Sequence, residues 1–151
     1  LDIGGGLSGI TARIYKDYER LGIGPQAYIL DGKADPPVAR GPGLTFNNAT
    51  MTQNFLRRNG VRRQAFLTPN DDLPRRVDLV LSIQAWGFHF APEVYAARVA
   101  GALAAKGVVV MDLRNAKPAW FDTCVEHFGP SSRALLTAAK WTRWAFSRYP
   151  V

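Results

Sequence analysis

The sequence predicts an α/β fold in which a mainly parallel sheet is covered by helices on both faces. Two observations carry this prediction. Short apolar runs alternate with amphipathic segments along most of the 151 residues, and this order is typical of strand–helix–strand units. A glycine-rich stretch, residues 1–10, joins the first apolar run to the first amphipathic segment. It indicates a tight turn from a strand into a helix, as at the ligand-binding edge of a parallel sheet.

The glycine-rich stretch Leu1–Ile10 has glycines at positions 4, 6 and 9. This spacing allows the backbone to turn sharply, to approach a ligand closely and to pack the following helix against the sheet. The free N–H groups at the start of that helix would face a polar or anionic group, and a nucleotide-type cofactor is the natural occupant. Because the spacing alone is a weak signal, a tight turn without a ligand remains the alternative.

Apolar periodicity and turn residues define the elements of the first half. We expect, in order, a helix at 10–21, a strand at 26–30, a proline- and glycine-rich surface loop at 33–46, a helix at 47–58 and a strand at 65–67. The helix at 47–58 should turn Met51, Phe55 and Leu56 inward.

The second half continues the alternation up to its last segment. We expect a strand at 77–82, a helix at 92–105, a buried strand at 108–112 and a helix at 118–128. The runs 132–137 and 141–149 are typical of two extended strands joined by a short loop, which would form an antiparallel hairpin. A single helix over 131–147 is the alternative, since alanine and leucine favour it.

Asp31 is a candidate ligand-binding residue. It follows the strand at 26–30 and lies 22 residues after Gly9, close to the position at which dinucleotide sites place a carboxylate for the ribose hydroxyls. A carboxylate accepts two hydrogen bonds from a vicinal diol. The alternative is that Asp31 and Gly32 simply form a turn.

The net charge of +7 comes from 19 basic and 12 acidic residues. It permits an anionic partner such as nucleic acid, but the arginines are spread along the chain without a nucleic-acid motif. One cysteine, Cys124, excludes an internal disulfide, and two histidines give no metal-ligand spacing. No apolar run approaches the roughly 18 residues that would span a bilayer. A cytoplasmic location without a membrane partner is therefore the default expectation.

Composition and length suit one globular domain over residues 1–151. Residue 1 already lies inside the expected first strand, so we expect the N-terminal part of the domain to be missing from this chain. The sequence makes no prediction of oligomeric state.

The chain resembles the class I S-adenosylmethionine (SAM)-dependent methyltransferases over nearly its whole length. Leu1–Gly9 is similar to the first motif of that family, in which an acidic residue precedes the glycines, and Leu30-Asp31 to its ribose-binding strand end. Val77–Ser82 resembles the fourth-strand motif. Leu103–Val109 resembles a further motif but lacks the proline and the second glycine usual there.

The resemblance implies a Rossmann-like, seven-stranded sheet whose last two strands form the hairpin. It also implies that the cofactor is SAM and assigns roles to residues. Asp2 and the backbone of Gly4, Gly5 and Gly6 would hold the methionine part, Asp31 with Gly32 the ribose, and Asn70 with Asp71 the adenine; Ser82, Ile83 and Gln84 would lie beside the sulfonium.

The segment Ile83–His89 is similar to sequences in sugar and small-molecule O-methyltransferases. The expected reaction is therefore methyl transfer to a hydroxyl, or another nucleophile, of a small-molecule acceptor. His89 is the candidate general base, because a near-neutral imidazole can accept a hydroxyl proton; the alternative is a loop or helix-capping histidine. Trp86, Phe88 and Phe90 would wall the acceptor pocket or belong to the core, the core being favoured for the two phenylalanines.

Three other functions stay open. A nicotinamide- or flavin-dependent Rossmann oxidoreductase uses the same glycine spacing and the same Asp31. Asp2 argues against it, because a carboxylate beside the glycine turn would repel a pyrophosphate and suits a cationic amino-acid group. A methyltransferase acting on RNA or protein would account better for the positive charge. A binding module without catalysis is the third.

Overall fold

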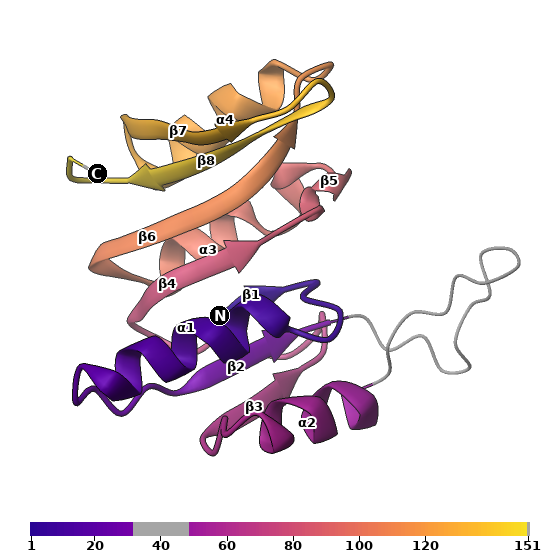
Figure 1. Cartoon of the computed structure of the whole chain (residues 1–151). Coiled ribbons are helices and arrows are strands. Elements are labelled where there is room, and N and C mark those ends of the chain that lie inside the picture. The colour runs from indigo at the N-terminus through magenta and orange to yellow at the C-terminus, as the bar shows by residue number, and fades with distance from the viewer. Residues whose placement is uncertain (32–48, 151) are drawn as a thin grey trace, which may run out of the picture. The chain divides into compact units, whose positions relative to one another are not determined.

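The computed structural model describes residues 1–31 and 49–150, and Figure 1 shows its elements along the chain. The chain divides into two compact units. The first comprises Asp2–Asp71, and the second comprises Leu1 together with Asp72–Val151. Within the described residues no helix has the length and apolar character needed to cross a membrane.

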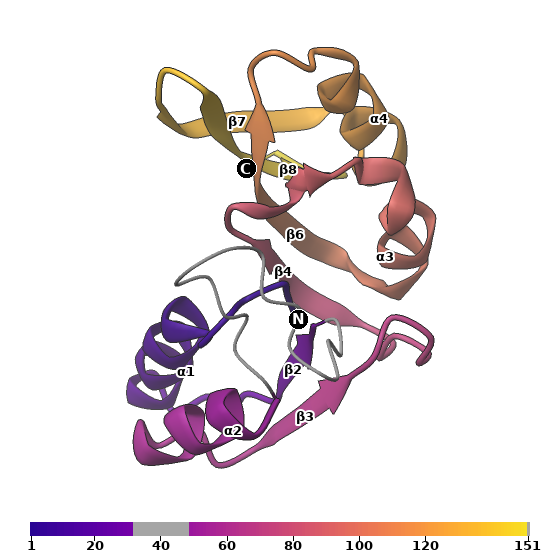
Figure 2. The same ribbon diagram turned by 90° about the vertical axis from the view of Figure 1, so that its right-hand side faces the viewer.

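The first unit consists of parallel strands and two helices. Its elements are β1 (Asp2–Ile3), α1 (Gly9–Arg20), β2 (Ala27–Leu30), α2 (Ala49–Arg58) and β3 (Gln64–Leu67). The strands lie side by side in the order β3-β2-β1, and both pairings are parallel. Figure 2 shows α1 and α2 on the same face of these strands. All carboxyl ends of the three strands therefore lie at one edge.

The core of the first unit joins both helices to the sheet. Ala12 and Tyr15 of α1 and Leu56 of α2 are buried against Ile29 of β2, with Val61 beside them. The buried residues of α1 recur at helical spacing, which leaves its charged face in solvent. Met51, expected to point inward, is 52% exposed. The buried Thr52 takes the inward position instead.

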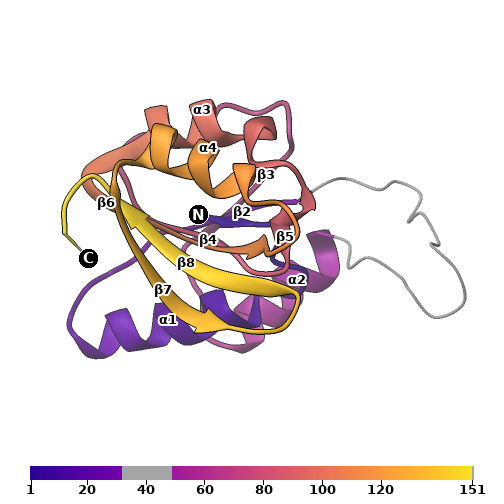
Figure 3. The same ribbon diagram turned by 90° about the horizontal axis from the view of Figure 1, so that it is seen from above.

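The second unit contains the remaining strands. Its elements are β4 (Val77–Ser82), β5 (Ala85–Phe90), a 3-10 turn η1 (Pro92–Val94), α3 (Ala96–Ala102), β6 (Leu103–Arg114), α4 (Ala119–Phe128), β7 (Ser131–Thr137) and β8 (Trp141–Ser147). The strand order is β4-β6-β8-β7. The β4–β6 pair is parallel, and both pairs that include β8 are antiparallel. Figure 3 shows α3 and α4 on one face of this sheet.

Seven sheet strands, mainly parallel with an antiparallel C-terminal hairpin, confirm the expected α/β class. The helix considered for 131–147 is therefore wrong. Alternate residues of β8 explain why the hairpin forms: Trp144 and Phe146 pack against Phe121 of α4, with ring centroids 4.6 and 5.6 Å away. Only an extended strand places residues two apart on the same face.

The helix expected at 92–105 is wrong at both ends. Pro92–Val94 form a 3-10 turn, and α3 ends at Ala102. Leu103 already pairs with Val77 of β4, and a bulge follows before Val108 pairs with Leu79. Helix propensity in the alanine-rich segment 100–105 is thus overridden by strand pairing. The strand β5 was not predicted.

Candidate functional site

The glycine turn lies at the carboxyl end of β1. Gly4 (φ +69°) and Gly6 (φ +57°) adopt the left-handed conformation that favours glycine. The N–H of Gly4 donates to the carbonyl of Leu30 (2.8 Å), which fixes the turn against β2. Thr52 Oγ1 of α2 donates to the Gly6 carbonyl (2.7 Å) and fixes it from the other side. The turn is therefore held by both neighbours and leads directly into α1.

Asp2 lies beneath this turn with only 5% of its surface exposed. Its Oδ2 accepts a hydrogen bond from Thr11 Oγ1 (2.7 Å). Burial raises the pKa of the Asp2 carboxyl, and the hydrogen bond from Thr11 opposes part of that shift. Burial therefore makes the charged form of Asp2 costly.

Gly5 and Ser8 complete the surroundings of Asp2. A Cβ on Gly5 would overlap the Asp2 carboxylate and lie 2.6 Å from Ser8 Oγ, so only glycine fits. Ser8 is 2% exposed, and its hydroxyl lies beside the Asp2 carboxyl, where it lowers the pKa of Asp2 as Thr11 does.

Gly9 does not have the packing role that the glycine spacing suggested. A Cβ at Gly9 would have nothing within 4 Å outside its neighbours and its own helix. The glycine at which a side chain would clash with its surroundings is Gly5 instead. The sequence argument missed Gly5 as the sterically required residue because the usual spacing rule counts positions 4, 6 and 9.

The other expected residues of the first unit lie at the same edge. Asp31 directly follows β2, is half-buried, and its N–H donates to the Leu67 carbonyl at the end of β3 (3.4 Å). Asn70 and Asp71 are exposed in the turn after β3. Asp71 Oδ2 accepts a hydrogen bond from the N–H of Thr68 (2.6 Å), so this carboxylate closes its own turn. Gly32 lies outside the described residues.

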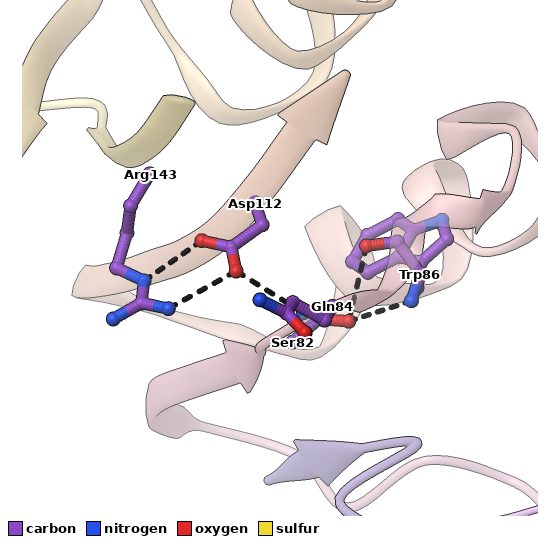
Figure 4. A network of polar contacts seen from close by, with 5 residues as sticks. All are labelled: Ser82, Gln84, Trp86, Asp112 and Arg143. Carbon is purple, nitrogen blue, oxygen red and sulfur yellow. Dashed lines mark hydrogen bonds and ion pairs between the residues drawn. The ribbon is translucent and has the colours of Figure 1, made fainter. Parts of the chain in front are cut away.

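The second unit contains a polar network at the carboxyl end of β4 (Figure 4). Ser82 Oγ accepts a hydrogen bond from the Trp86 N–H (2.8 Å) and donates to the Trp86 carbonyl (3.1 Å). The Gln84 N–H donates to Asp112 Oδ2 (3.2 Å). Asp112 is fully buried and is bound by Arg143 through Nε (2.7 Å) and Nη2 (3.0 Å). The network therefore joins β4, β5, β6 and β8.

Sequence reasoning missed Asp112 and Arg143 as members of this network. A signal was present: Asp112 is an acidic residue within the β-branched run of the expected buried strand, and a buried carboxylate requires a partner. The partner lies 31 residues further along the chain. Only the antiparallel register, which pairs Asp112 with Arg143, brings the two together.

Trp86 does not line a surface that a substrate could reach. It is fully buried, its Nε1 donates to the Pro92 carbonyl (3.0 Å), and it forms edge-to-face contacts with Tyr95 and Phe128. The substrate-wall interpretation of Trp86 is therefore wrong in this structure. Phe90, for which the core was favoured, is 53% exposed.

His89 lies near the end of β5 and is exposed. The ring centroids of His89 and Phe88 are 5.1 Å apart in an edge-to-face contact. Arg114 also contacts Phe88. Its guanidinium carbon is 4.6 Å from the Phe88 ring centroid, and its Nε donates a hydrogen bond to the Phe88 carbonyl. His89 is therefore a strand residue, neither a loop residue nor a helix cap.

The sequence matches no family model and no curated protein. Solved structures, in contrast, match over almost the whole chain. A candidate O-methyltransferase from Nostoc punctiforme PCC 73102 superposes with a TM-score of 0.69 at 14% identity, covering 97% of this chain and 51% of that chain. This chain thus spans about half the length of that protein.

Two further structures extend the comparison. Precorrin-6y C5,15-methyltransferase from Geobacter metallireducens GS-15 has a TM-score of 0.64 at 14% identity, covering 97% of this chain and 77% of that one. A TehB-like SAM-dependent methyltransferase from Corynebacterium glutamicum ATCC 13032 Kitasato has a TM-score of 0.61 at 13% identity, with coverages of 98% and 78%. The chain has the fold of the SAM-dependent methyltransferases. At these identities the likeness concerns the fold, and the site must be argued from the residues.

Proposed function

We propose that this chain is a SAM-dependent methyltransferase that methylates a hydroxyl group of a small molecule. One observation carries the proposal. In a methyltransferase fold, a buried acidic residue, a glycine turn and an aspartate after the second strand meet at one edge of β1 and β2.

The surroundings of Asp2 fit the amino-acid part of SAM. Asp2 is a buried carboxylate, and burial raises its pKa. The ammonium group of the methionine part would stabilise the charged form of Asp2. Ser8 Oγ, buried beside Asp2, is proposed to bond the same ligand. Gly5 keeps the space around Asp2 free of a side chain.

Asp31 is the residue proposed to bind the ribose. It follows β2 at the edge that the glycine turn also occupies. Its carboxylate would accept hydrogen bonds from the two ribose hydroxyls. Asn70, exposed in the turn after β3, is proposed to contact the adenine, while the Asp71 carboxylate is engaged in holding that turn.

Bound SAM supplies an electrophilic methyl group, so the chain has mainly to position the acceptor and exclude water. An alcohol acceptor must also lose its proton. We propose that His89 takes this proton, because it is an exposed imidazole near the carboxyl end of β5, next to Phe88, which Arg114 at the carboxyl end of β6 contacts. Ile83 and Gln84, which follow β4, are proposed to line the path of the methyl group.

The cofactor is tested by calorimetric titration of the chain with S-adenosylhomocysteine (SAH) and, separately, with NADH. We expect SAH binding that Asp31→Ala weakens about tenfold or more, since two charge-assisted hydrogen bonds are lost. Asp17→Ala, on the exposed face of α1, is the matched control and should bind as the wild type does. Binding of NADH without SAH would overturn the proposal in favour of an oxidoreductase.

The base is tested by methyl transfer to a panel of hydroxylated small molecules. His89→Gln should lower kcat by about 100-fold or more while leaving SAH affinity unchanged, because general-base catalysis contributes on that scale. Unchanged turnover in His89→Gln would remove His89 from the mechanism.

A further inference from the structure

The turn between β4 and β5 holds a residue in an unfavourable conformation. Gln84 has a φ of +52°, in the left-handed region that residues with a side chain rarely adopt. The turn is clamped at its base, because Ser82 Oγ binds both the N–H and the carbonyl of Trp86. That clamp fixes where β5 begins. It does not itself hold the Gln84 backbone.

The group that holds Gln84 is the carboxylate of Asp112. Its Oδ2 accepts the Gln84 N–H at 3.2 Å (Figure 4). Asp112 lies on β6, and strand alternation directs it away from the face on which Met111 contacts Cys124 of α4. The carboxylate is thus aimed at the turn from the side opposite to the helices.

Arg143 fixes the orientation of the Asp112 carboxylate. It donates from Nε to Oδ1 at 2.7 Å and from Nη2 to Oδ2 at 3.0 Å. Such a two-point contact sets the plane of the carboxylate as well as its distance. The guanidinium carbon also lies 5.3 Å from the ring centroid of Trp141. Arg143, Asp112 and Gln84 therefore form a chain of fixed contacts that ends at a backbone N–H.

A buried ion pair is a poor device for stability alone, because an apolar pair of similar size often stabilises as well or better. What an apolar pair cannot do is accept the Gln84 N–H. We propose that the Asp112–Arg143 pair is a positioning device that holds Ile83 and Gln84 in the geometry needed to bind the cofactor. This inference rests on the proposed function, in which these two residues line the path of the methyl group.

A double-mutant cycle tests this role, with SAH as the probe in calorimetric titration. Asp112→Asn should weaken SAH binding about tenfold, because asparagine has one acceptor oxygen in place of two and cannot keep both the two-point contact with Arg143 and the bond from the Gln84 N–H. In a Gln84→Gly background the same change should cost less than about threefold, since glycine adopts a positive φ without strain. Asp78→Asn, on the exposed part of β4, should leave SAH affinity unchanged in both backgrounds.

The thermal unfolding midpoint of each variant separates positioning from stability. A structural role alone predicts that Asp112→Asn lowers the midpoint without weakening SAH binding, or weakens it equally in both backgrounds; either result would overturn the inference. Arg143→Lys provides the same comparison if Asp112→Asn does not fold, because lysine keeps the charge but not the two-point contact. Absence of SAH binding by the wild-type chain would overturn the proposed function itself.

Discussion

The charge of Asp2 is expected to lower the stability of the free chain and to raise its affinity for the cofactor. It is buried beneath the glycine turn, which raises the pKa of its carboxyl and makes the charged form costly at neutral pH. The hydrogen bond from Thr11 compensates only part of this cost. In the proposed function the same charge attracts the ammonium of the methionine part. Stability of the free chain and affinity for the cofactor should therefore respond in opposite directions when the charge is removed.

Replacing Asp2 by Asn should raise the unfolding midpoint of the free chain at pH 7. Because the folded chain binds the Asp2 proton more tightly than the unfolded chain does, this group favours folding at low pH, and its contribution is lost as pH rises through the folded pKa. The wild-type midpoint should thus fall more than that of Asp2→Asn as pH rises from the ordinary aspartate pKa towards neutrality. Scanning calorimetry over this range measures both. A lower midpoint for Asp2→Asn at pH 7 would contradict the account.

Cys124 should be unreactive in the folded chain. Burial raises its thiol pKa to about 12, with Glu93 adding to the shift, and the side chain is fully buried beside Met111. The thiolate is the reactive form, so both access and ionisation are suppressed. A disulfide reagent at pH 8 should label the chain only after unfolding in urea. Rapid labelling of the native chain would show that α4 does not stay packed against β6.

At the scale of elements, β5 depends on its close approach to β6. Gly87 has a φ of +82°, and a Cβ there would lie 2.5 Å from Met111 Cε and 2.9 Å from the Asp112 carbonyl oxygen. The close approach carries β5 past Asp112, the residue that holds the β4–β5 turn. The packing of Gly87 against β6 and the conformation of the β4–β5 turn therefore depend on the same segment of β6.

Gly87→Ala should destabilise the chain by about 3 kcal/mol, from overpacking together with the strained backbone. Gly101→Ala is the matched control in α3, where a Cβ would meet nothing within 4 Å. It should stabilise the chain by up to about 1 kcal/mol, because alanine favours the helix. Urea unfolding of both variants measures the difference. Equal stability of the two would show that β5 moves away from β6 at little cost.

Local patterns predicted some elements and missed others for physical reasons. Strand β4 and helix α4 follow from continuous apolar runs and helical periodicity, which depend only on neighbouring residues. The hairpin was ambiguous until the family resemblance was used. Strand β5 and the early end of α3 depend on pairing with distant strands, and no local pattern contains that information.

At the scale of the whole molecule, the fold was predictable and the candidate site only in part. Asp2, the glycine turn and Asp31 could be placed from the sequence, because parallel strands bring their carboxyl ends to one edge. The contact of Thr52 with the turn and the Asp112–Arg143 pair each join residues from different elements of one unit, and such contacts arise only through tertiary packing. Trp86 was misplaced because an aromatic residue in such a segment suits a pocket and a core equally well.

The central claim is that the glycine turn above Asp2 binds the amino-acid part of SAM. Calorimetric titration of Gly5→Ala with SAH tests it most directly, with Gly24→Ala as control. At Gly5 a Cβ would overlap the Asp2 carboxylate, whereas at Gly24 it would lie 3.6 Å from Arg63 Nη1, in ordinary contact. We expect Gly5→Ala to remain folded but to lose SAH affinity by about 100-fold, and Gly24→Ala to bind as the wild type does. A folded Gly5→Ala variant with wild-type SAH affinity would contradict the account.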